Sequence, residues 1–493
     1  MKHHPIYRVY YFFGAIAIGL TAFVLSCADG RGTLSLAERS EFGSYVYQLD
    51  SAHAEQAVWY SLLGVSPDAD SIVAILSREV PRAGLDTAAF FIAQLQADLD
   101  VVHSLAFDSL GLDINEVITR IEDNLTEAYL LYTTGQRYGF VRPDRLLNRH
   151  DTTPEGNYVR LFDYKVKAPD REPAQQHLTQ DDRIDYLLES QPRNPLYTTL
   201  QACLDSTTDA ARRRTLVVNM ERCRWQMERP VEEGRRILVN IPSQYLWALG
   251  GDSVLGMRIC CGAVATKTPL LHSAVTHIQV NPAWVIPFNI LKNEIAPHAG
   301  DSAYFARHRY DITERSSGKA LNPRTVTAAQ IRSGRIRVSQ RGGAGNSLGR
   351  IIFRFPNDFS VYLHDTSSPS AFQRERRTVS HGCVRVQKPF DLACFMMPEA
   401  DEWLLDRLRI SMDIKPETDR GRKYLRDYEL EHPASERDRT APHRLISYSD
   451  ISPRVPLYIL YYTAFVNPES GQLEFYPDLY HFDSLIANNL PTR

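Results

Sequence analysis

A cysteine and a histidine stand close enough in the sequence to form a nucleophilic pair. Cys383 ends the run Ser380-His381-Gly382-Cys383, and His364 precedes that run by fifteen intervening residues. A thiol is a weak nucleophile until it loses its proton, and an imidazole can take that proton and then stabilise the thiolate. These residue types predict a cysteine site for acyl transfer, although a Cys and two His within about 20 positions are more often structural than catalytic.

The backbone expected around Cys383 would support this chemistry. His364 ends a predicted strand over residues 360–364, where its side chain is held rigidly. Cys383 is predicted in a tight loop just before a helix over residues 389–397, whose positive N-terminal end would favour a thiolate and whose free N–H groups could bind an oxyanion. Gly382 would let the backbone approach a carbonyl substrate closely. The pattern therefore predicts an acyl-transfer site at Cys383, with a nearby histidine to take the thiol proton.

These residues belong to a second half that reads as mostly β. Short runs rich in β-branched and aromatic residues predict strands at 236–242, 245–249, 254–260, 274–280, 351–355, 360–364 and 457–466. Residues 288–346 interrupt them with charged and glycine-rich sequence, which is too long for a simple loop and is typical of a functional lid. We expect a catalytic domain over 236–483 with an inserted capping segment at 288–346, followed by a tail over 484–493.

The first half reads as helical. Its clearest segment runs from Ile114 to Tyr132, where apolar residues recur every three or four positions and charged residues occupy the other faces. No residue types in this half point to chemistry, so a structural scaffold domain over 27–230 is expected. The predicted fold class is α+β, with a helical domain followed by a mostly β catalytic domain.

Composition excludes several classes of protein. The 493 residues contain 56 Lys and Arg against 59 Asp and Glu, a net charge of −3, so no overall basic field points to nucleic acid. The seven cysteines are few and irregular, which excludes a disulfide scaffold, and no CxxC pair suggests zinc. Because seven is odd, at least one cysteine is unpaired within the chain.

The N-terminus indicates export. Two basic residues, Lys2 and Arg8, precede an uncharged, mostly apolar run from Tyr10 to Leu25, which is too short for a spanning helix and suits a signal peptide over 1–26. The run ends at Cys27, as in the lipobox of bacterial lipoproteins, where the cysteine carries the lipid. The other interpretations are an uncleaved anchor or an ordinary signal peptide. In each case we expect the rest of the chain to work outside the cytoplasm, in the cell envelope facing the periplasm.

The active-site motif resembles the signature of the YkuD-type L,D-transpeptidases, in which a His is followed by Ser/Thr-His-Gly-Cys, an apolar residue and Asn or Arg. The flanking sequences resemble the large YcbB-like branch of that family. They include Asn281-Pro282-Ala283-Trp284, Tyr362-Leu363-His364-Asp365-Thr366 and Glu221-Arg222-Cys223-Arg224-Trp225. The chain departs from the longer members of that branch in one respect. About ten polar residues, Asp205 to Arg214, stand where those members carry a peptidoglycan-binding domain.

The resemblance implies a reaction on peptidoglycan. Cys383 would attack the third residue of a stem tetrapeptide, D-Ala would leave, and the thioester would be resolved by an amine of a second stem to give a 3-3 cross-link. His364 would be the base, and the backbone carbonyl of Asp365 would orient its imidazole. The N–H groups of Gly382 and Cys383 would bind the oxyanion, with Ser380 and His381 beside them.

The resemblance also suggests substrate contacts. Tyr362 lies in the same group, Arg385 would bind a stem carboxylate or else form a structural salt bridge, and Trp284 would line the opening or belong to the core. The charged run Arg374-Glu375-Arg376-Arg377 is expected to be a solvated loop face, and Cys394 a buried thiol. This chemistry needs no metal or cofactor. The expected partners are the donor and acceptor stem peptides and, through the lipid on Cys27, a membrane.

Three further functions stay open at this point. With water as the acceptor the same acyl-enzyme would be an L,D-carboxypeptidase, and with a protein amine it would attach a protein to the wall. A non-catalytic wall-binding scaffold is the third, and the presence of both His364 and Cys383 argues against it. The residues alone do not choose the acceptor.

Overall fold

The computed structural model describes residues 31–35, 46–50, 57–61, 64–227, 234–432 and 443–491. These fall into two compact units: Met1–Arg137 with Pro169–Gln191 and Pro491–Arg493, and Tyr138–Ala168 with Pro192–Leu490. Cys27 and the predicted signal peptide lie outside the described residues. No helix within the described ranges is long and apolar enough to cross a membrane.

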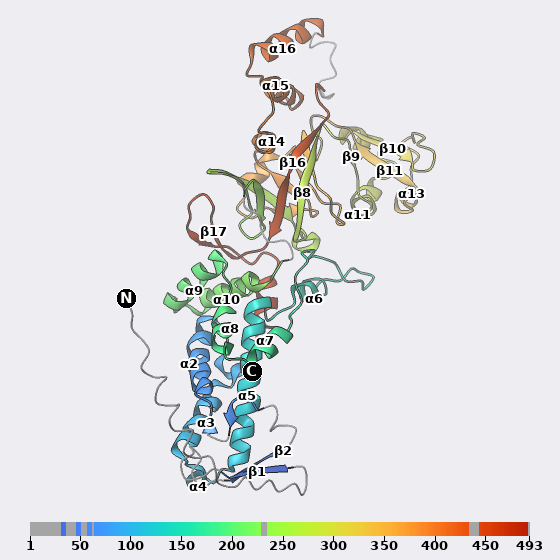
Figure 1. Ribbon diagram of the computed structural model, residues 1–493. Coiled ribbons are helices and arrows are strands. Elements are labelled where there is room, and N and C mark those ends of the chain that lie inside the picture. Colours follow the sequence, from blue (N-terminus) through green and yellow to red (C-terminus); the bar gives the residue numbers. More distant parts are fainter. Residues whose placement is uncertain are drawn as a thin grey trace. The chain divides into compact units, whose positions relative to one another are not determined.

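The first unit is mainly helical (Figure 1). Its longest helix, α5 (Ile114–Tyr138), buries Val117, Ile121 and Leu125 on one face, as the spacing of apolar residues predicts. The other helices are α2 (Pro67–Arg82), η1 (Thr87–Phe90), α3 (Ile92–Ser104), α4 (Phe107–Leu110), α7 (Glu172–Leu178) and α8 (Arg183–Glu189). In the described part of this unit, short strands pair as β1 (Arg31–Ser35) with β2 (Val46–Asp50) and β3 (Tyr60–Ser61) with β4 (Gly64–Val65).

The second unit is built around a nine-stranded sheet in the order β14-β7-β15-β13-β12-β8-β16-β5-β6. The strands are β5 (Arg236–Asn240), β6 (Tyr245–Gly250), β7 (Ser253–Gly262), β8 (Leu271–Val280), β12 (Ile351–Arg354), β13 (Leu363–His364), β14 (Thr378–Ser380), β15 (Val384–Val386) and β16 (Tyr448–Leu460). The first half of β7 pairs with β6 and its second half with β15 and β14, so the two ends of the sheet meet at β7. A large apolar core lies against this sheet.

Helices and short strands surround the sheet. They are α6 (Pro143–Leu147), α9 (Pro195–Ser206), α10 (Ala210–Arg224), η2 (Val264–Thr266), η5 (Pro369–Gln373), α14 (Pro389–Met396), α15 (Glu402–Ser411), α16 (Asp419–Glu431), β17 (Ala464–Val466), β18 (Leu473–Phe475) and α17 (Phe482–Ala487). Helices α9 and α10, which lie in the range 27–230 expected for the scaffold domain, share a small apolar core with Ala464 of β17. The predicted tail over 484–493 contains most of α17, and Ile486 in it is fully buried.

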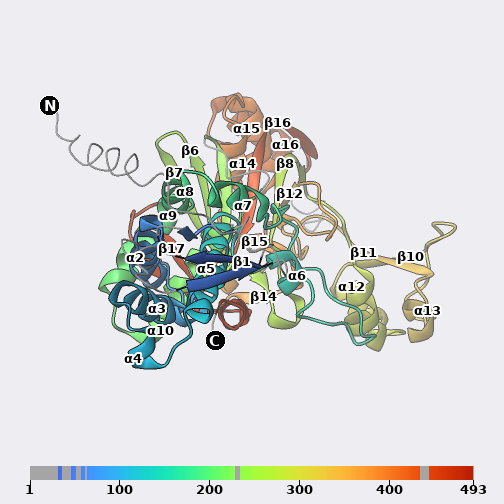
Figure 2. The same ribbon diagram turned by 60° about the horizontal axis from the view of Figure 1, so that its bottom comes forward.

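The inserted segment forms a small subdomain of its own. Strands β9 (Trp284–Val285), β10 (Tyr310–Glu314) and β11 (Ile336–Gln340) make a separate sheet in the order β10-β11-β9. Figures 1 and 2 both show β10 and β11 grouped with the helices of this segment, apart from the main sheet. The helices are α11 (Phe288–Ile290), η3 (Leu291–Ile295), η4 (Ala296–His298), α12 (Ser302–Arg307) and α13 (Ala328–Arg332), around a second apolar core.

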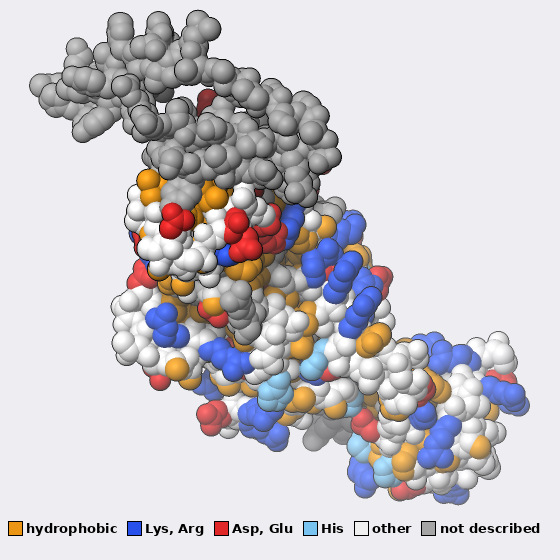
Figure 3. Space-filling view, turned by 90° about the horizontal axis from the view of Figure 1, so that it is seen from below, with side chains coloured by type: hydrophobic (Ala, Val, Ile, Leu, Met, Phe, Trp, Pro, Cys, Tyr) orange, Lys and Arg blue, Asp and Glu red, His pale blue; other side chains and the backbone are white. Residues whose placement is uncertain are grey.

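Charges are mixed on the surface. Lys and Arg side chains are interspersed with Asp and Glu side chains on the face displayed in Figure 3. This matches the near balance of 56 basic and 59 acidic residues in the sequence.

Candidate active site

Two neighbouring parallel strands bring the predicted nucleophile and base to one face of the sheet. On β13 and β15, Leu363 pairs with Val384 and His364 pairs with Arg385. Cys383 directly precedes β15, and the Val384 N–H donates to the Tyr362 carbonyl at 3.1 Å. Side chains alternate along a strand and paired residues share a face. By this alternation the side chains of Tyr362, His364, Cys383 and Arg385 share one face, while Leu363, Val384 and Val386 point into the apolar core. Tyr362 and Cys383 also contact the margin of that core.

The loop before Cys383 is fixed by Ser380. Its hydroxyl donates to the Cys383 carbonyl at 2.5 Å and accepts from the Gly382 N–H at 3.2 Å. Gly382 has a φ of +112°, a backbone conformation that only glycine adopts without strain. The Gly382 N–H is engaged by Ser380, whereas the Cys383 N–H has no hydrogen-bond partner among the described residues.

The His364 imidazole is buried and uncharged. It is 4% exposed, and its Nδ1 has no hydrogen-bond partner in the described part of the chain. Burial, assisted by the positive charge of Arg385, lowers the pKa of His364 to about 3, although the backbone carbonyls of Asp365 and Leu348 act in the opposite direction. Neutral imidazole is the form that can accept the thiol proton.

The Cys383 thiol is also neutral before reaction. Burial raises its pKa above the ordinary value, and this outweighs the backbone and phenol of Tyr362 and the charges of Arg354 and Arg385, which favour the thiolate. The resting pair is therefore a neutral thiol beside a neutral imidazole rather than a preformed ion pair. The imidazole would remove the proton as the thiol attacks.

The predicted support from a helix N-terminus is wrong. Cys383 is followed by strand β15, and helix α14 begins only at Pro389. The helix itself was predicted correctly, but the intervening strand separates its N-terminus from Cys383 along the chain. Instead, the groups that favour the thiolate come from Tyr362 and two arginines.

Tyr362 contacts several members of the site. Its ring meets the His364 ring edge to face at 5.7 Å between centroids, and the Arg354 guanidinium lies 4.5 Å from its centroid. Its phenol interacts with Cys383 and with the Trp284 indole, and burial raises the pKa of that phenol above its usual value. Trp284 also packs against the core of the inserted segment, so it belongs both to that core and to the surroundings of Tyr362.

The Asp365 carboxylate supports a turn rather than the imidazole. It accepts from the Arg350 N–H at 2.7 Å, and burial raises its pKa. A Cβ on Gly349 would lie 2.4 Å from the Asp365 side chain, so glycine is required where the turn passes this carboxylate. The prediction that Asp365 would act through its backbone is compatible with the carbonyl near His364.

His381 and Arg385 differ in their partners. His381 Nε2 lies 2.7 Å from Glu294 Oε1. This contact joins the loop over residues 380–383, called the catalytic loop below, to η3 of the inserted segment. Arg385 forms no ion pair with a described acid, and its buried Nε has no hydrogen-bond partner among the described residues. The structure thus offers no support for Arg385 as a structural salt bridge. No cluster of three or more His, Cys, Asp or Glu that could hold a metal occurs in the described ranges.

Three nearby residues were missed from the sequence. Arg354 on β12 lies over Tyr362, Glu294 bonds His381, and the Thr268 hydroxyl donates to the Gly382 carbonyl at 2.9 Å. Arginine, glutamate and threonine are common surface residues, and none of the three lies in the motif. Only the tertiary contacts single them out.

Comparison with known proteins finds a domain match over the region that contains these residues. Residues 234–408 match the L,D-transpeptidase catalytic domain called YkuD, and residues 47–204 match a family described as Scaffold domain. A curated Haemophilus influenzae protein provisionally named an L,D-transpeptidase is 30% identical over 253 residues, which cover 51% of this chain and 45% of that protein. The match therefore spans about half the length of each protein.

A solved structure, titled "Structure of the Ldtfm-avibactam carbamoyl enzyme", is 14% identical, with a TM-score of 0.20 and coverage of 55% of this chain and 76% of that one. A TM-score this low does not establish a shared fold. The two family matches follow the order of a helical scaffold and then a mostly β catalytic domain. The chain therefore carries a YkuD-type L,D-transpeptidase catalytic domain, preceded by a Scaffold domain.

Proposed function

We propose that the protein is a cysteine L,D-transpeptidase that releases D-Ala from peptidoglycan stem tetrapeptides and forms 3-3 cross-links. The observation that carries the proposal is that His364 and Cys383 project from one face of paired strands inside the region matching the catalytic domain. In the first half-reaction the sulfur attacks the carbonyl of the third stem residue, His364 takes the thiol proton, and D-Ala leaves with a proton on its amine.

The second half-reaction resolves the thioester. An amine on a second stem attacks the same carbonyl, His364 accepts the amine proton, and the Cys383 thiol is restored. The Cys383 N–H would stabilise the oxyanion in both steps, and Arg385 would bind a stem carboxylate bidentately. Tyr362 and Trp284 would contact the stem beside the thiol.

The test compares two cysteines of the same domain. Cys383→Ala should abolish D-Ala release from a disaccharide tetrapeptide, whereas Cys394→Ala, which removes a thiol from α14, should leave it within about twofold. A carbapenem should add once, on the Cys383 peptide, as seen by mass spectrometry. D-Ala release by the Cys383→Ala protein, or an adduct on another peptide, would overturn the assignment.

The acceptor is tested by the products. Purified enzyme with tetrapeptide muropeptides should give 3-3 linked dimers. Tripeptide alone would instead identify an L,D-carboxypeptidase that uses water, and a muropeptide joined to added protein would identify an attachment enzyme. Muropeptide binding with no product of any kind would identify a non-catalytic wall-binding scaffold.

In the proposed function the enzyme works in the cell envelope, held to a membrane by a lipid on Cys27. This part rests on the sequence of residues 1–27 alone. Cys27→Ser should move the protein from the membrane fraction to the soluble periplasmic fraction, and labelled palmitate should be incorporated only when Cys27 is present. Membrane retention of the Ser variant would favour an uncleaved anchor.

A further inference from the structure

A buried threonine outside the motif, Thr268, forms a hydrogen bond with the backbone of the catalytic loop. Thr268 is 1% exposed, and its hydroxyl accepts from the Gly262 N–H at 2.9 Å and donates to the Gly382 carbonyl at 2.9 Å. A hydroxyl has one hydrogen to donate, so its donor capacity is spent on Gly382. A Cβ on Gly262 would come within 2.7 Å of the Thr268 backbone nitrogen, which shows how closely the two segments pack.

Thr268 is itself positioned by a buried tyrosine. The Tyr480 hydroxyl donates to the Gly262 carbonyl at 2.8 Å and accepts from the Thr268 N–H at 3.2 Å. Its ring is fully buried, so the hydroxyl has no access to solvent as an alternative partner. One phenol therefore holds Thr268 and its hydrogen-bond partner Gly262 together.

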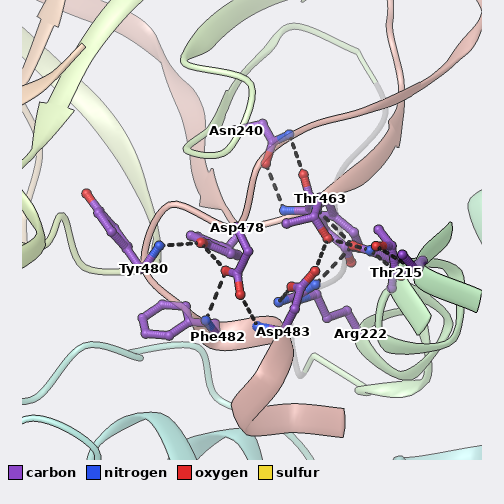
Figure 4. A network of polar contacts seen from close by, with 12 residues as sticks. Thr215, Arg222, Asn240, Thr463, Asp478, Tyr480, Phe482 and Asp483 are labelled. Atoms are coloured by element: carbon purple, nitrogen blue, oxygen red, sulfur yellow. Dashed lines mark hydrogen bonds and ion pairs between the residues drawn. The ribbon is translucent and has the colours of Figure 1, made fainter. Parts of the chain in front are cut away.

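The segment that carries Tyr480 is anchored by a polar network (Figure 4). The Tyr480 N–H donates to the Tyr461 hydroxyl at 2.7 Å, and that hydroxyl donates to Asp478 at 2.6 Å. The Asp478 carboxylate also accepts from the N–H groups of Phe482 and Asp483, at 3.0 and 2.9 Å. These contacts leave the backbone at Tyr480 little freedom to move.

The direction of one peptide group links this network to the chemistry. The Gly382–Cys383 peptide is trans, since the one cis bond in the described chain is Ser452–Pro453. In a trans peptide the C=O and N–H point in opposite directions. Because Thr268 holds the Gly382 carbonyl, the Cys383 N–H must point away from Thr268. That N–H has no hydrogen-bond partner among the described residues, whereas the Gly382 N–H bonds to Ser380.

We propose that Thr268 is a positioning residue, which aims the Cys383 N–H at the oxyanion formed during acylation, and that Tyr480 holds Thr268 in place. The inference rests on the proposed acyl-enzyme and goes beyond it by naming what orients the oxyanion donor. Misaiming one such donor should cost up to about 10²-fold to 10³-fold in the rate of acyl transfer.

Two reagents separate this role from general damage. Acylation by p-nitrophenyl acetate forms a C–S bond through a tetrahedral oxyanion and expels p-nitrophenolate. Alkylation by iodoacetamide forms a C–S bond by displacing iodide. Both reactions remove the thiol proton, but the alkylation passes through no oxyanion. Thr268→Val in the full chain should slow acylation of Cys383 by about 10²-fold and leave its alkylation within about twofold. Thr268→Ser, which keeps the hydroxyl, should restore acylation to within about threefold.

The controls keep the inference falsifiable if Thr268→Val folds poorly. Tyr480→Phe keeps the buried ring and should slow acylation by about tenfold, again with alkylation unchanged. Thr133→Val removes another buried hydroxyl, which donates to the Tyr129 carbonyl inside α5, and should change neither rate. Acylation at the wild-type rate in Thr268→Val or Tyr480→Phe, or equal slowing of both reactions, would overturn the inference. Absence of D-Ala release from muropeptides would defeat the proposed function without affecting this comparison.

Discussion

The His381 Nε2 and Glu294 Oε1 atoms lie 2.7 Å apart and join the catalytic loop to the inserted segment. Both side chains are about half exposed, at 51% and 52%. An ion pair in water is worth about 0–1 kcal/mol, so this contact is too weak to stabilise the fold. It is strong enough, however, to alter how often the inserted segment separates from the loop.

Glu294→Gln tests that effect. The change should raise amide hydrogen exchange in residues 291–295 about twofold to fivefold, because part of the contact that holds η3 against the loop is lost. The free energy of unfolding should change by less than about 1 kcal/mol. Glu314→Gln is a matched control, since Glu314 bonds Ser317 within the same segment. Unchanged exchange in Glu294→Gln would mean that other contacts hold the segment.

The pH dependence of Cys383 alkylation tests the neutral resting pair. Because burial raises the thiol pKa and lowers that of His364 to about 3, no proton should move between them at rest. The rate of iodoacetamide alkylation should therefore rise about tenfold per pH unit from pH 5 to pH 8, without a step near pH 6.5. Subtraction of the Cys383→Ala rate removes the other thiols. A plateau below pH 7 would instead reveal a thiolate–imidazolium pair.

The same histidine should make the fold sensitive to acid. The pKa of His364 is about 3 in the folded chain and about 6.5 when unfolded, so the unfolded state binds more protons between these values. The contribution of His364 to the free energy of unfolding is fully present above pH 6.5 and is lost as the pH drops toward 3. His364→Gln should reduce the loss between pH 7.5 and pH 4 by roughly 1–3 kcal/mol, measured by denaturant unfolding. His432→Gln, at an exposed position, is the control. If His364→Gln loses as much unfolding free energy between pH 7.5 and pH 4 as the wild type, the low pKa of His364 is contradicted.

Much of the site could be predicted because its parts are local in sequence. The strand ending at His364 and the helix beginning at Pro389 both follow from apolar spacing and proline placement, and the structure has both. Gly382 lies in the loop that was expected before Cys383, and there its φ is positive. Strand pairing then brings Cys383 and His364 together without any further signal from the sequence.

Contacts between distant segments could not be predicted in the same way. The run 374–377 was expected to be solvated, and residues 374–376 are exposed, but Arg377 is buried. Its guanidinium donates to the carbonyls of Ile259 and Gln244 at 3.0 and 3.1 Å. Backbone carbonyls leave no trace in side-chain patterns, so neither this arginine nor Thr268 could be recognised before the strands were assembled.

Asp365 should matter for stability and little for the chemical step. Its carboxylate accepts the Arg350 N–H, and an amide oxygen could replace that acceptor. Asp365→Asn should therefore acylate within about threefold of wild type. Asp365→Ala should lose about 1–3 kcal/mol of unfolding free energy, because the partly buried Arg350 N–H loses its partner. Acylation rates and denaturant unfolding measure both effects. A drop of 10²-fold in the Asn variant would indicate that the charge itself assists His364.

Arg385 should recognise a carboxylate of the donor stem. It lies on the face that carries Cys383, forms no ion pair with a described acid, and keeps a buried Nε without a hydrogen-bond partner in the described chain. A guanidinium binds a carboxylate bidentately, which an ammonium or an amide cannot reproduce. Arg385→Gln and Arg385→Lys should both raise KM for the tetrapeptide, by about tenfold or more, with a smaller change in kcat.

Substrate analogues identify which carboxylate it binds. Two tetrapeptides are compared, one amidated at the terminal D-Ala and the other at the side-chain carboxylate of the third residue. The wild-type enzyme should bind one of them poorly, and Arg385→Gln should no longer distinguish that analogue from the parent, because the loss of either partner already removes the interaction. If the losses from amidation and from Arg385→Gln simply add for both analogues, Arg385 does not contact the stem, and its positive charge acts only on His364 and Cys383.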